Sequence, residues 1–179
     1  MRTRSLLSGA YACLLILLFS GCSDDIDLSN EQEIFFEVNY ANNAWTYQFK
    51  GFLIDKEGRI RTYDLPAKWV NVEGGTTITV DELDANLSKT AISSHSVPIT
   101  ELDKYKLEAA QISDADFTKP ENVGADMGGT SYLMYKYDPS RKVYKAILLK
   151  QTGDVVIYNK DSKAKGIADW LTQITDEVY

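Results

Sequence analysis

Apolar and polar residues alternate in the first part of the ordered chain. Every second side chain from Ile34 to Tyr40 is apolar or aromatic, which is the two-residue period of a β-strand with one buried face. Asn42-Asn43 follows, a pair that tolerates positive φ and favours a tight turn. The alternation resumes from Trp45 to Phe49, so the two runs predict an antiparallel hairpin.

The phase of this alternation changes within the second strand. Phe52 and Ile54 have the opposite parity to Trp45, and Gly51 lies where the change occurs. A glycine at such a position predicts a β-bulge or a sharp bend. We therefore expect the second strand to be irregular near this residue.

Further turns and strands follow toward residue 80. Gly58 lies in a polar turn where a left-handed conformation is needed, and a third strand over 59–65 follows it. Two shorter runs, 68–72 and 76–80, flank the pair Gly74-Gly75. Their β-branched and aromatic residues predict two more strands.

Helical spacing predicts three helices, over residues 80–89, 101–112 and 162–175. Thr79 and Glu82 have the spacing of a capping box at the start of the first helix. Thr100 and Ser162 are the predicted N-caps of the other two helices.

The remaining chain predicts loops and a second group of strands. Residues 90–98 and 114–129 lack a clear period, and the second segment has the length of a functional loop. The runs 131–137 and 143–151 predict a hairpin, and 155–158 a further strand.

These elements together predict an α+β fold. Its mainly antiparallel sheet is built from two strand blocks, about 33–80 and 131–158, with short helices between them and a C-terminal helix.

The N-terminus has the layout of a secretory signal. Arg2 and Arg4 precede an apolar run from Leu6 to Phe19, and the small residues Ser20-Gly21 end it. The uncharged span 5–23 is also long enough for an uncleaved membrane anchor, which is the alternative interpretation.

The residues before Cys22 favour a lipoprotein signal. Phe19-Ser20-Gly21-Cys22 resembles the bacterial lipobox, although the usual first residue of that motif is Leu. The resemblance implies cleavage before Cys22 and attachment of lipid, with acyl chains such as palmitate, to this cysteine. More than one acyl chain would make the membrane attachment through Cys22 stable.

The residues after Cys22 carry a second resemblance. Cys22-Ser23-Asp24-Asp25 is similar to the export signal of Bacteroidetes-type lipoproteins, which implies a lipid-anchored protein of the outer membrane, exposed at the cell surface. The alternative is a periplasm-facing protein in which this run is a solvated tether. The expected organisation is a signal peptide over 1–21, lipidated Cys22 with a flexible acidic tether over 22–32, and a single globular α+β domain over 33–179.

Charge limits the possible partners, and cysteine content limits how the domain can be stabilised. Removal of Arg2 and Arg4 takes the formal net charge from −7 to −9, and such an acidic chain is a poor partner for nucleic acid. Cys13 lies in the signal and Cys22 takes the lipid, so the mature domain has no disulfide. The domain must therefore be stabilised by its core alone.

No residue pattern indicates a catalytic residue, a cofactor or a metal. His95, the single histidine, is expected in a solvated loop, and its serine neighbours do not form a triad without an orienting carboxylate. One histidine and no free cysteine also argue against zinc. Three acidic clusters lack the pattern of a calcium-binding loop. They are Asp81/Glu82/Asp84, Asp114/Asp116 and Asp24/Asp25/Asp27.

Aromatic residues are the one abundant type of side chain in this sequence that suits ligand recognition. Their rings suit sugar stacking or protein contacts, although strand aromatics are more often part of a core. Tyr135 and Tyr137 share a strand face and are the candidate ligand-binding residues if they are exposed. We therefore expect a non-catalytic binding or accessory module for a glycan or protein ligand. The alternatives are a structural or inhibitory envelope lipoprotein that caps another protein, and a small hydrolase.

Overall fold

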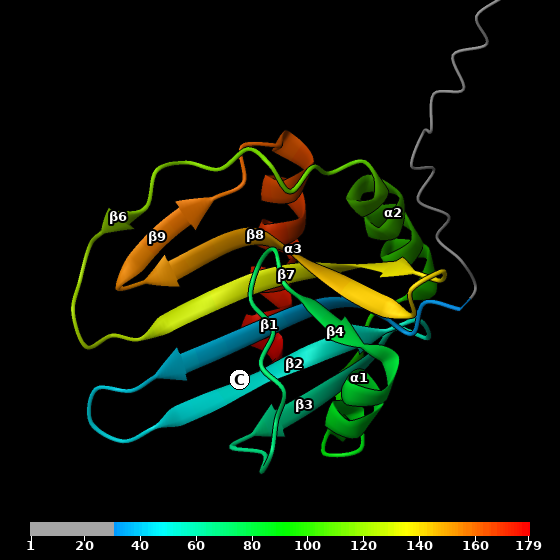
Figure 1. Cartoon of the computed structure of the whole chain (residues 1–179), viewed down its shortest axis with the longest axis horizontal. Coiled ribbons are helices and arrows are strands. Elements are labelled where there is room, and N and C mark those ends of the chain that lie inside the picture. The colour runs from blue at the N-terminus through cyan, green and yellow to red at the C-terminus, as the bar shows by residue number, and fades with distance from the viewer. Residues whose placement is uncertain (1–30) are drawn as a thin grey trace, which may run out of the picture.

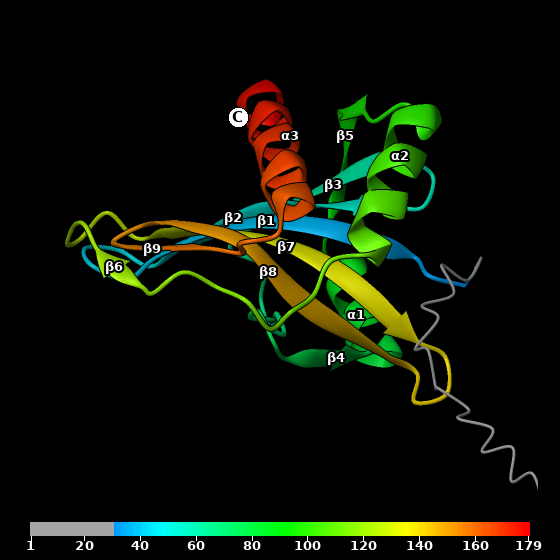
Figure 2. The ribbon, with the colours of Figure 1, turned by 90° about the horizontal axis from the view of Figure 1, so that it is seen from above.

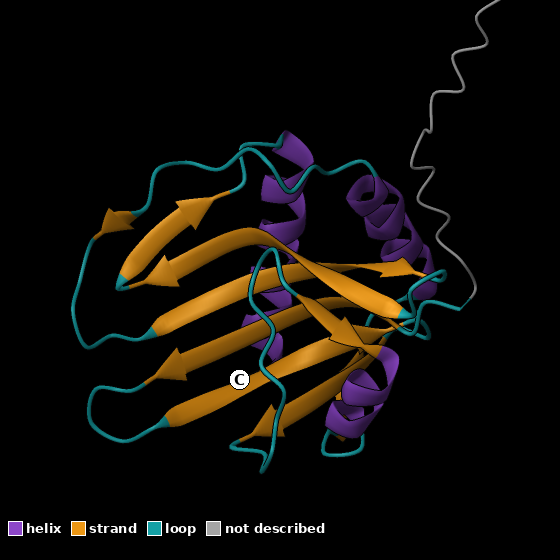
Figure 3. Ribbon diagram, in the orientation of Figure 1, coloured by secondary structure: helices purple, strands orange, loops and turns teal. Residues whose placement is uncertain are grey.

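The computed structural model describes residues 31–179, which form one large sheet and three helices (Figure 3). The strands are β1 (Ile34–Asn42), β2 (Gln48–Asp55), β3 (Arg59–Asp64), β4 (Thr77–Thr79), β5 (Ala91–Ser96), β6 (Glu121–Asn122), β7 (Gly129–Asp138), β8 (Val143–Gly153) and β9 (Val155–Tyr158). The helices are α1 (Val80–Leu87), α2 (Ile99–Ala110) and α3 (Ser162–Val178).

The strands pair antiparallel in the order β5-β3-β2-β1-β7-β8-β9-β6, and β4 pairs with β8 outside this path (Figure 1). The two predicted strand blocks meet at the centre of the sheet, where β1 pairs with β7. The predicted α+β fold with a mainly antiparallel sheet and a C-terminal helix is confirmed.

Helices and β4 cover the two faces of the sheet unequally. Helices α2 and α3 lie on one face, and α1 and β4 lie on the other (Figure 2). Two apolar cores result. The helix core, under α2 and α3, includes Phe36, Val38, Phe52, Ile54, Leu102, Ile147, Ile167, Trp170 and Leu171. The α1 core, on the opposite face, includes Ile34, Phe49, Leu53, Tyr63, Ile78, Leu83, Tyr135 and Tyr144.

Two-sided burial explains the phase change in β2. Phe49 and Leu53 belong to the α1 core, whereas Phe52 and Ile54 belong to the helix core. Because both faces are covered, apolar residues occupy both parities of one regular strand. The pairing of β1 with β2 continues without a shift at Gly51, so the predicted bulge at this residue is wrong.

Close packing, and not a bulge, accounts for the glycine at position 51. A Cβ there would lie 2.2 Å from the carbonyl oxygen of Val38 and 2.6 Å from the hydroxyl of Tyr63. Gly51 therefore leaves the space that the Tyr63 side chain needs above the sheet.

Residues 65–76 connect β3 to β4 and pass over the α1-core face of the sheet (Figure 1). We call this segment the strap. A strand predicted at 68–72 is absent, so that prediction is wrong. Leu65 and Lys68 have positive φ angles of 44° and 57°, which no strand permits. The buried side chain of Asn86 accepts from the Val70 N–H at 3.0 Å and donates to its carbonyl at 2.8 Å, in place of a strand partner.

Two other predicted loops differ from the structure. Residues 90–98 contain β5, an exposed edge strand paired with β3, so the loop prediction is wrong. An edge strand with both faces solvated carries no hydrophobic period. The tight turn at Asn42-Asn43 is also wrong, since β2 begins only at Gln48. Asn42 instead accepts from the Ala44 N–H at 2.8 Å and donates to Asp126 O at 3.1 Å.

Of the three predicted helix N-caps, that of α1 is confirmed and those of α2 and α3 are not. The Thr79/Glu82 capping box of α1 is present as predicted. Helix α2 follows Pro98, so Thr100 lies inside it, and the cap of α3 is Asp161, which accepts from the Lys163 N–H at 2.8 Å. The caps predicted at Thr100 and Ser162 are therefore wrong. No helix within residues 31–179 combines the length and the hydropathy needed to span a membrane.

Candidate ligand-binding site

A hollow of about 700 Å³ lies between the strap and the half of the sheet that the α1 core leaves uncovered. Its volume is within the range of about 300–1,000 Å³ that is usual for small-molecule sites. We call it the sheet hollow. It is lined by Asn39, Ala41, Asn43, Tyr47, Phe49, Asn71, Val72, Glu73, Gly74, Gly129, Ser131, Leu148, Gln151 and Ile157.

Three polar side chains form the floor of the sheet hollow. Asn39 on β1 pairs with Ser131 on β7, and Ser131 pairs with Gln151 on β8. Directly paired residues project from the same face of a sheet, so the three form a continuous polar row across three adjacent strands. Their chain neighbours Val38 and Tyr132 point into the helix core.

The strap forms the opposite wall and is held to the rest of the domain at Val70 and at Gly75-Thr76. Its first half is held by Asn86, and its second half is bonded to β8 by the Gly75 N–H to Ala146 O at 2.8 Å and the Ala146 N–H to Thr76 O at 2.9 Å. A Cβ at Gly74 would lie 2.6 Å from the Leu148 Cβ, so glycine permits this contact. Asn71 and Glu73 are thereby held at the hollow.

Aromatic residues border the open end. Tyr47 lines the hollow, is 50% exposed and stacks on Phe49 with 6.4 Å between ring centroids. Trp45, in the same β1–β2 loop, is 87% exposed. The alternating pattern predicts both rings in a strand, whereas the structure places them in a loop that leaves them accessible to a ligand.

Two groups of polar side chains have different roles. Four buried amides bond to the backbone and stabilise the fold; they belong to Gln32, Asn42, Asn86 and Asn159. Within residues 31–179, no hydrogen bond to protein is formed by the side chains of four residues that line the hollow. These are Asn43, Asn71, Ser131 and Gln151. Their donors and acceptors are therefore available to a ligand or to water.

A buried carboxyl group lies on the same strand face as Asn39. Glu37 is 3% exposed and accepts hydrogen bonds from the hydroxyls of Tyr63, at 2.6 Å, and Tyr135. Burial raises the pKa of Glu37 above its ordinary value, while hydrogen bonds with Tyr135, Tyr63 and Asn39 act in the opposite direction. Glu37 does not line the hollow, so it is not placed to exchange a proton with a ligand there.

The two tyrosines proposed from the sequence have different surroundings. Tyr135 is buried, and burial beside Glu37 raises the pKa of its hydroxyl well above the usual range. Tyr137 is half-buried and packs on Tyr144 with 4.8 Å between centroids. Neither residue lines the sheet hollow. The candidate ligand-binding residues are therefore those of the polar row and the aromatic residues of the β1–β2 loop. Cys22, the proposed lipid site, lies outside the described residues.

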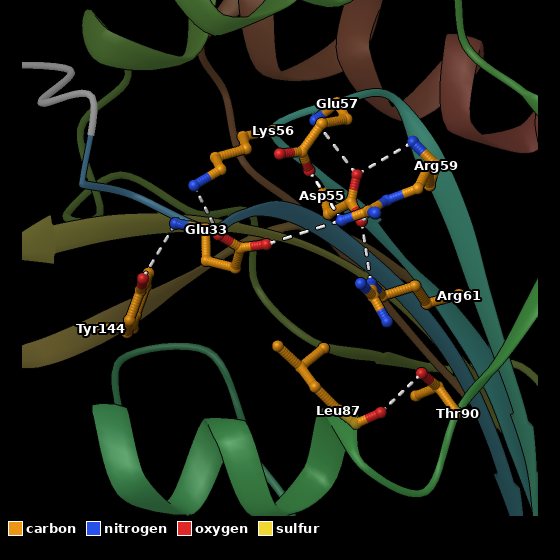
Figure 4. Close-up of polar contacts among 9 residues, drawn as sticks. All are labelled: Glu33, Asp55, Lys56, Glu57, Arg59, Arg61, Leu87, Thr90 and Tyr144. Atoms are coloured by element: carbon orange, nitrogen blue, oxygen red, sulfur yellow. Dashed lines mark hydrogen bonds and ion pairs between the residues drawn. The ribbon is translucent and has the colours of Figure 1, made fainter.

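A group of three acidic residues, Glu33, Asp55 and Glu57, brings its carboxylates close enough to hold a metal ion (Figure 4). Their charges are already neutralised. Asp55 is fully buried and accepts from the Nε atoms of Arg59 at 2.7 Å and Arg61 at 2.8 Å. Lys56 pairs with Glu33 at 2.9 Å and Arg59 with Glu57 at 2.8 Å. Each carboxylate is paired with a cation of the protein, so this cluster fits a structural ion-pair network.

Three residues of the acidic clusters considered in the sequence, Glu82, Asp114 and Asp116, are likewise engaged. Glu82 belongs to the capping box of α1. Asp114 pairs with Lys145, which lowers the pKa of that carboxyl, and Asp116 pairs with Lys160 at 2.7 Å. The cluster Asp24/Asp25/Asp27 lies outside the described residues. His95 is exposed on β5.

Comparisons with known proteins add no family to these observations. No protein-family model, no curated protein and no solved structure matches the chain. The functional argument therefore rests on the geometry and chemistry of the chain itself.

The buried Glu37 predicts a defined pH dependence of stability. Its folded-state pKa is raised, so its contribution to stability is complete below the ordinary glutamate pKa and is lost as pH rises through the folded value. Glu37→Gln removes this titration. The free energy of unfolding of the variant, relative to wild type, is expected to increase as pH rises above about 4.3.

Urea unfolding at a series of pH values measures this difference. Tyr135→Phe is the companion variant, because losing one hydrogen bond that lowers the pKa extends the loss of stability to higher pH. A difference between wild type and Glu37→Gln that stays constant with pH would contradict the assignment.

Proposed function

We propose that the chain is a lipoprotein of the outer membrane, exposed at the cell surface, that acts as a non-catalytic binding or accessory module. Lipid on Cys22 anchors it, and the sheet hollow takes a glycan or protein ligand. The observation that carries the proposal is the polar row, Asn39, Ser131 and Gln151, facing an open hollow beside accessible aromatic rings.

The chemistry of the lining favours binding over catalysis. Among the residues that line the sheet hollow, Glu73 alone is ionisable apart from the phenol of Tyr47. Hydrolysis of a glycosidic bond generally needs a pair of carboxyl groups, and the buried Glu37 is not in the lining. Amides and hydroxyls at a hollow orient a ligand by hydrogen bonds without reacting with it.

The position of the hollow suits a protein attached through its N-terminal segment. The described chain enters the sheet at one end of β1, and the loop 43–47 with its exposed rings lies at the opposite end (Figure 1). Attachment ahead of β1 therefore leaves the rim of the hollow free to meet a ligand.

Replacement of the cysteine tests the anchor. Cys22→Ala is expected to abolish labelling with radioactive palmitate and to release the protein from the outer-membrane fraction, because it removes the acceptor sulfur. Cys13→Ala, in the expected signal peptide, is the matched control and should leave both unchanged. Protease added to whole cells then tests exposure at the cell surface, and digestion of the wild-type protein is the expected result. Palmitate labelling that persists in Cys22→Ala would contradict lipidation at this residue.

Filling the hollow tests the binding site. Ser131→Trp places a large ring on the floor and is expected to abolish binding of the full chain to glycan and peptide arrays. Gln48→Trp is the matched control, since Gln48 is exposed and lines a different hollow. Thermal unfolding of both variants confirms that they fold. Equal binding by Ser131→Trp and wild type, or cleavage of a bound ligand, would contradict the proposal.

A further inference from the structure

We infer that the ligand of the sheet hollow is a neutral oligosaccharide. The inference rests on the proposed function and narrows it, because it assigns the ligand a chemical class from the side chains at the hollow. Hydrogen-bonding capacity, charge, backbone pairing and the aromatic rim support the same class.

The free polar groups match hydroxyls. Each amide of Asn43, Asn71 and Gln151 offers both a donor and an acceptor, and Ser131 offers a hydroxyl that can do either. A sugar hydroxyl also donates and accepts, so neighbouring hydroxyls can bond to paired amide groups. An ionic ligand would need opposite charges, and the floor contains none.

Charge disfavours acidic ligands. The single formal charge in the lining is the carboxylate of Glu73, and the whole chain has a formal net charge of −7. A uronic acid brought beside Glu73 would add like-charge repulsion. The carboxylate can instead accept hydrogen bonds from neutral hydroxyls.

Backbone pairing disfavours an extended peptide. Strand β1 is paired with β2 and β7, and β7 is paired with β1 and β8. Gln151 on β8 is paired with Ile157 on β9, so the floor has no open strand edge. A peptide that binds by strand addition needs such an edge. Recognition on this floor must therefore use side chains.

The rim offers a stacking surface. Tyr47 is 50% exposed and stacked on Phe49, so its ring is held in place at the hollow. Amphipathic rings pack against the apolar faces of sugars while their polar edges stay hydrated. Trp45 lies two residues away and is accessible for an additional sugar unit.

Ligand-observed NMR and calorimetry on the full chain test the inference. The protein is kept in a detergent without a sugar headgroup. The neutral probes are malto-, cello-, xylo- and manno-oligosaccharides. Oligogalacturonides are the acidic probes, chitosan oligomers the cationic ones, and mixed short peptides the non-glycan ones.

We expect at least one neutral series to bind, with oligogalacturonides at least about tenfold weaker. Asn71→Ala and Gln151→Ala should each weaken neutral binding by about fivefold, which corresponds to one hydrogen bond. Tyr47→Ala should weaken it similarly and Tyr47→Phe should not, because the ring carries the stacking. Gln48→Ala, on the other face, is the control. Glu73→Gln should reduce the preference for neutral over acidic probes.

The failures are distinguishable. Stronger binding of acidic, cationic or peptide probes, lost in Gln151→Ala, would overturn the neutral-sugar assignment and leave the proposed function standing. Neutral binding that survives Asn71→Ala, Gln151→Ala and Tyr47→Ala would also overturn it. Absence of binding to every probe class would overturn both.

Discussion

Strand β1 is hydrogen-bonded along both edges and flanked by a core on each face, and the rest of the structure depends on this position. A strand with two paired edges has its backbone groups satisfied, so its side chains alone decide what covers it. Phe36 and Val38 project from one face, and α2 and α3 pack on that face. Glu37 and Asn39 face the other side, where polar groups must find partners or remain near water.

The change from core to open surface occurs along that second face. Glu37 lies where burial is complete, and the hydroxyls of Tyr63 and Tyr135 satisfy its carboxyl. One strand position further on the same face, Asn39 reaches the hollow and begins the row that continues through Ser131 and Gln151. The strap, fixed by Asn86 and by Ala146, keeps the second wall at a distance from this row.

Periodicity predicted the elements that have one dominant apolar face. The hairpin of β7 and β8, the strand β9 and all three helices are found close to their predicted ranges. The wrong predictions have physical causes that lie in contacts between distant residues, which the local sequence pattern does not contain. Asn86 satisfies Val70 from 16 residues away, so the strap has strand-like composition without a strand. Gly51 makes room for Tyr63, a residue on the neighbouring strand.

The candidate site was harder to predict than the fold. Tyr135 and Tyr137 share a face as expected, but the partner of Tyr135 is Glu37, and 98 residues separate the two in sequence. Asn39, Ser131 and Gln151 are ordinary polar strand residues until the register of three strands is known. The sequence contains only a weak signal for this row. Asn39 lies between the apolar Val38 and the aromatic Tyr40, whereas Gln151 lies between the polar residues Lys150 and Thr152. The exposure of Trp45 and Tyr47 depends on a loop longer than the predicted turn.

The central claim is that the free amides of the sheet hollow contact the ligand. Side-chain amide signals of the ¹⁵N-labelled full chain, followed by NMR while the tightest-binding oligosaccharide is added, test it most directly. The NH₂ signals of Asn71 and Gln151 are predicted to shift, while those of Asn86 and Asn159, which are bonded to backbone carbonyls, stay in place. Shifts confined to the α3 face of the sheet, or unchanged Asn71 and Gln151 signals at saturation, would contradict the account.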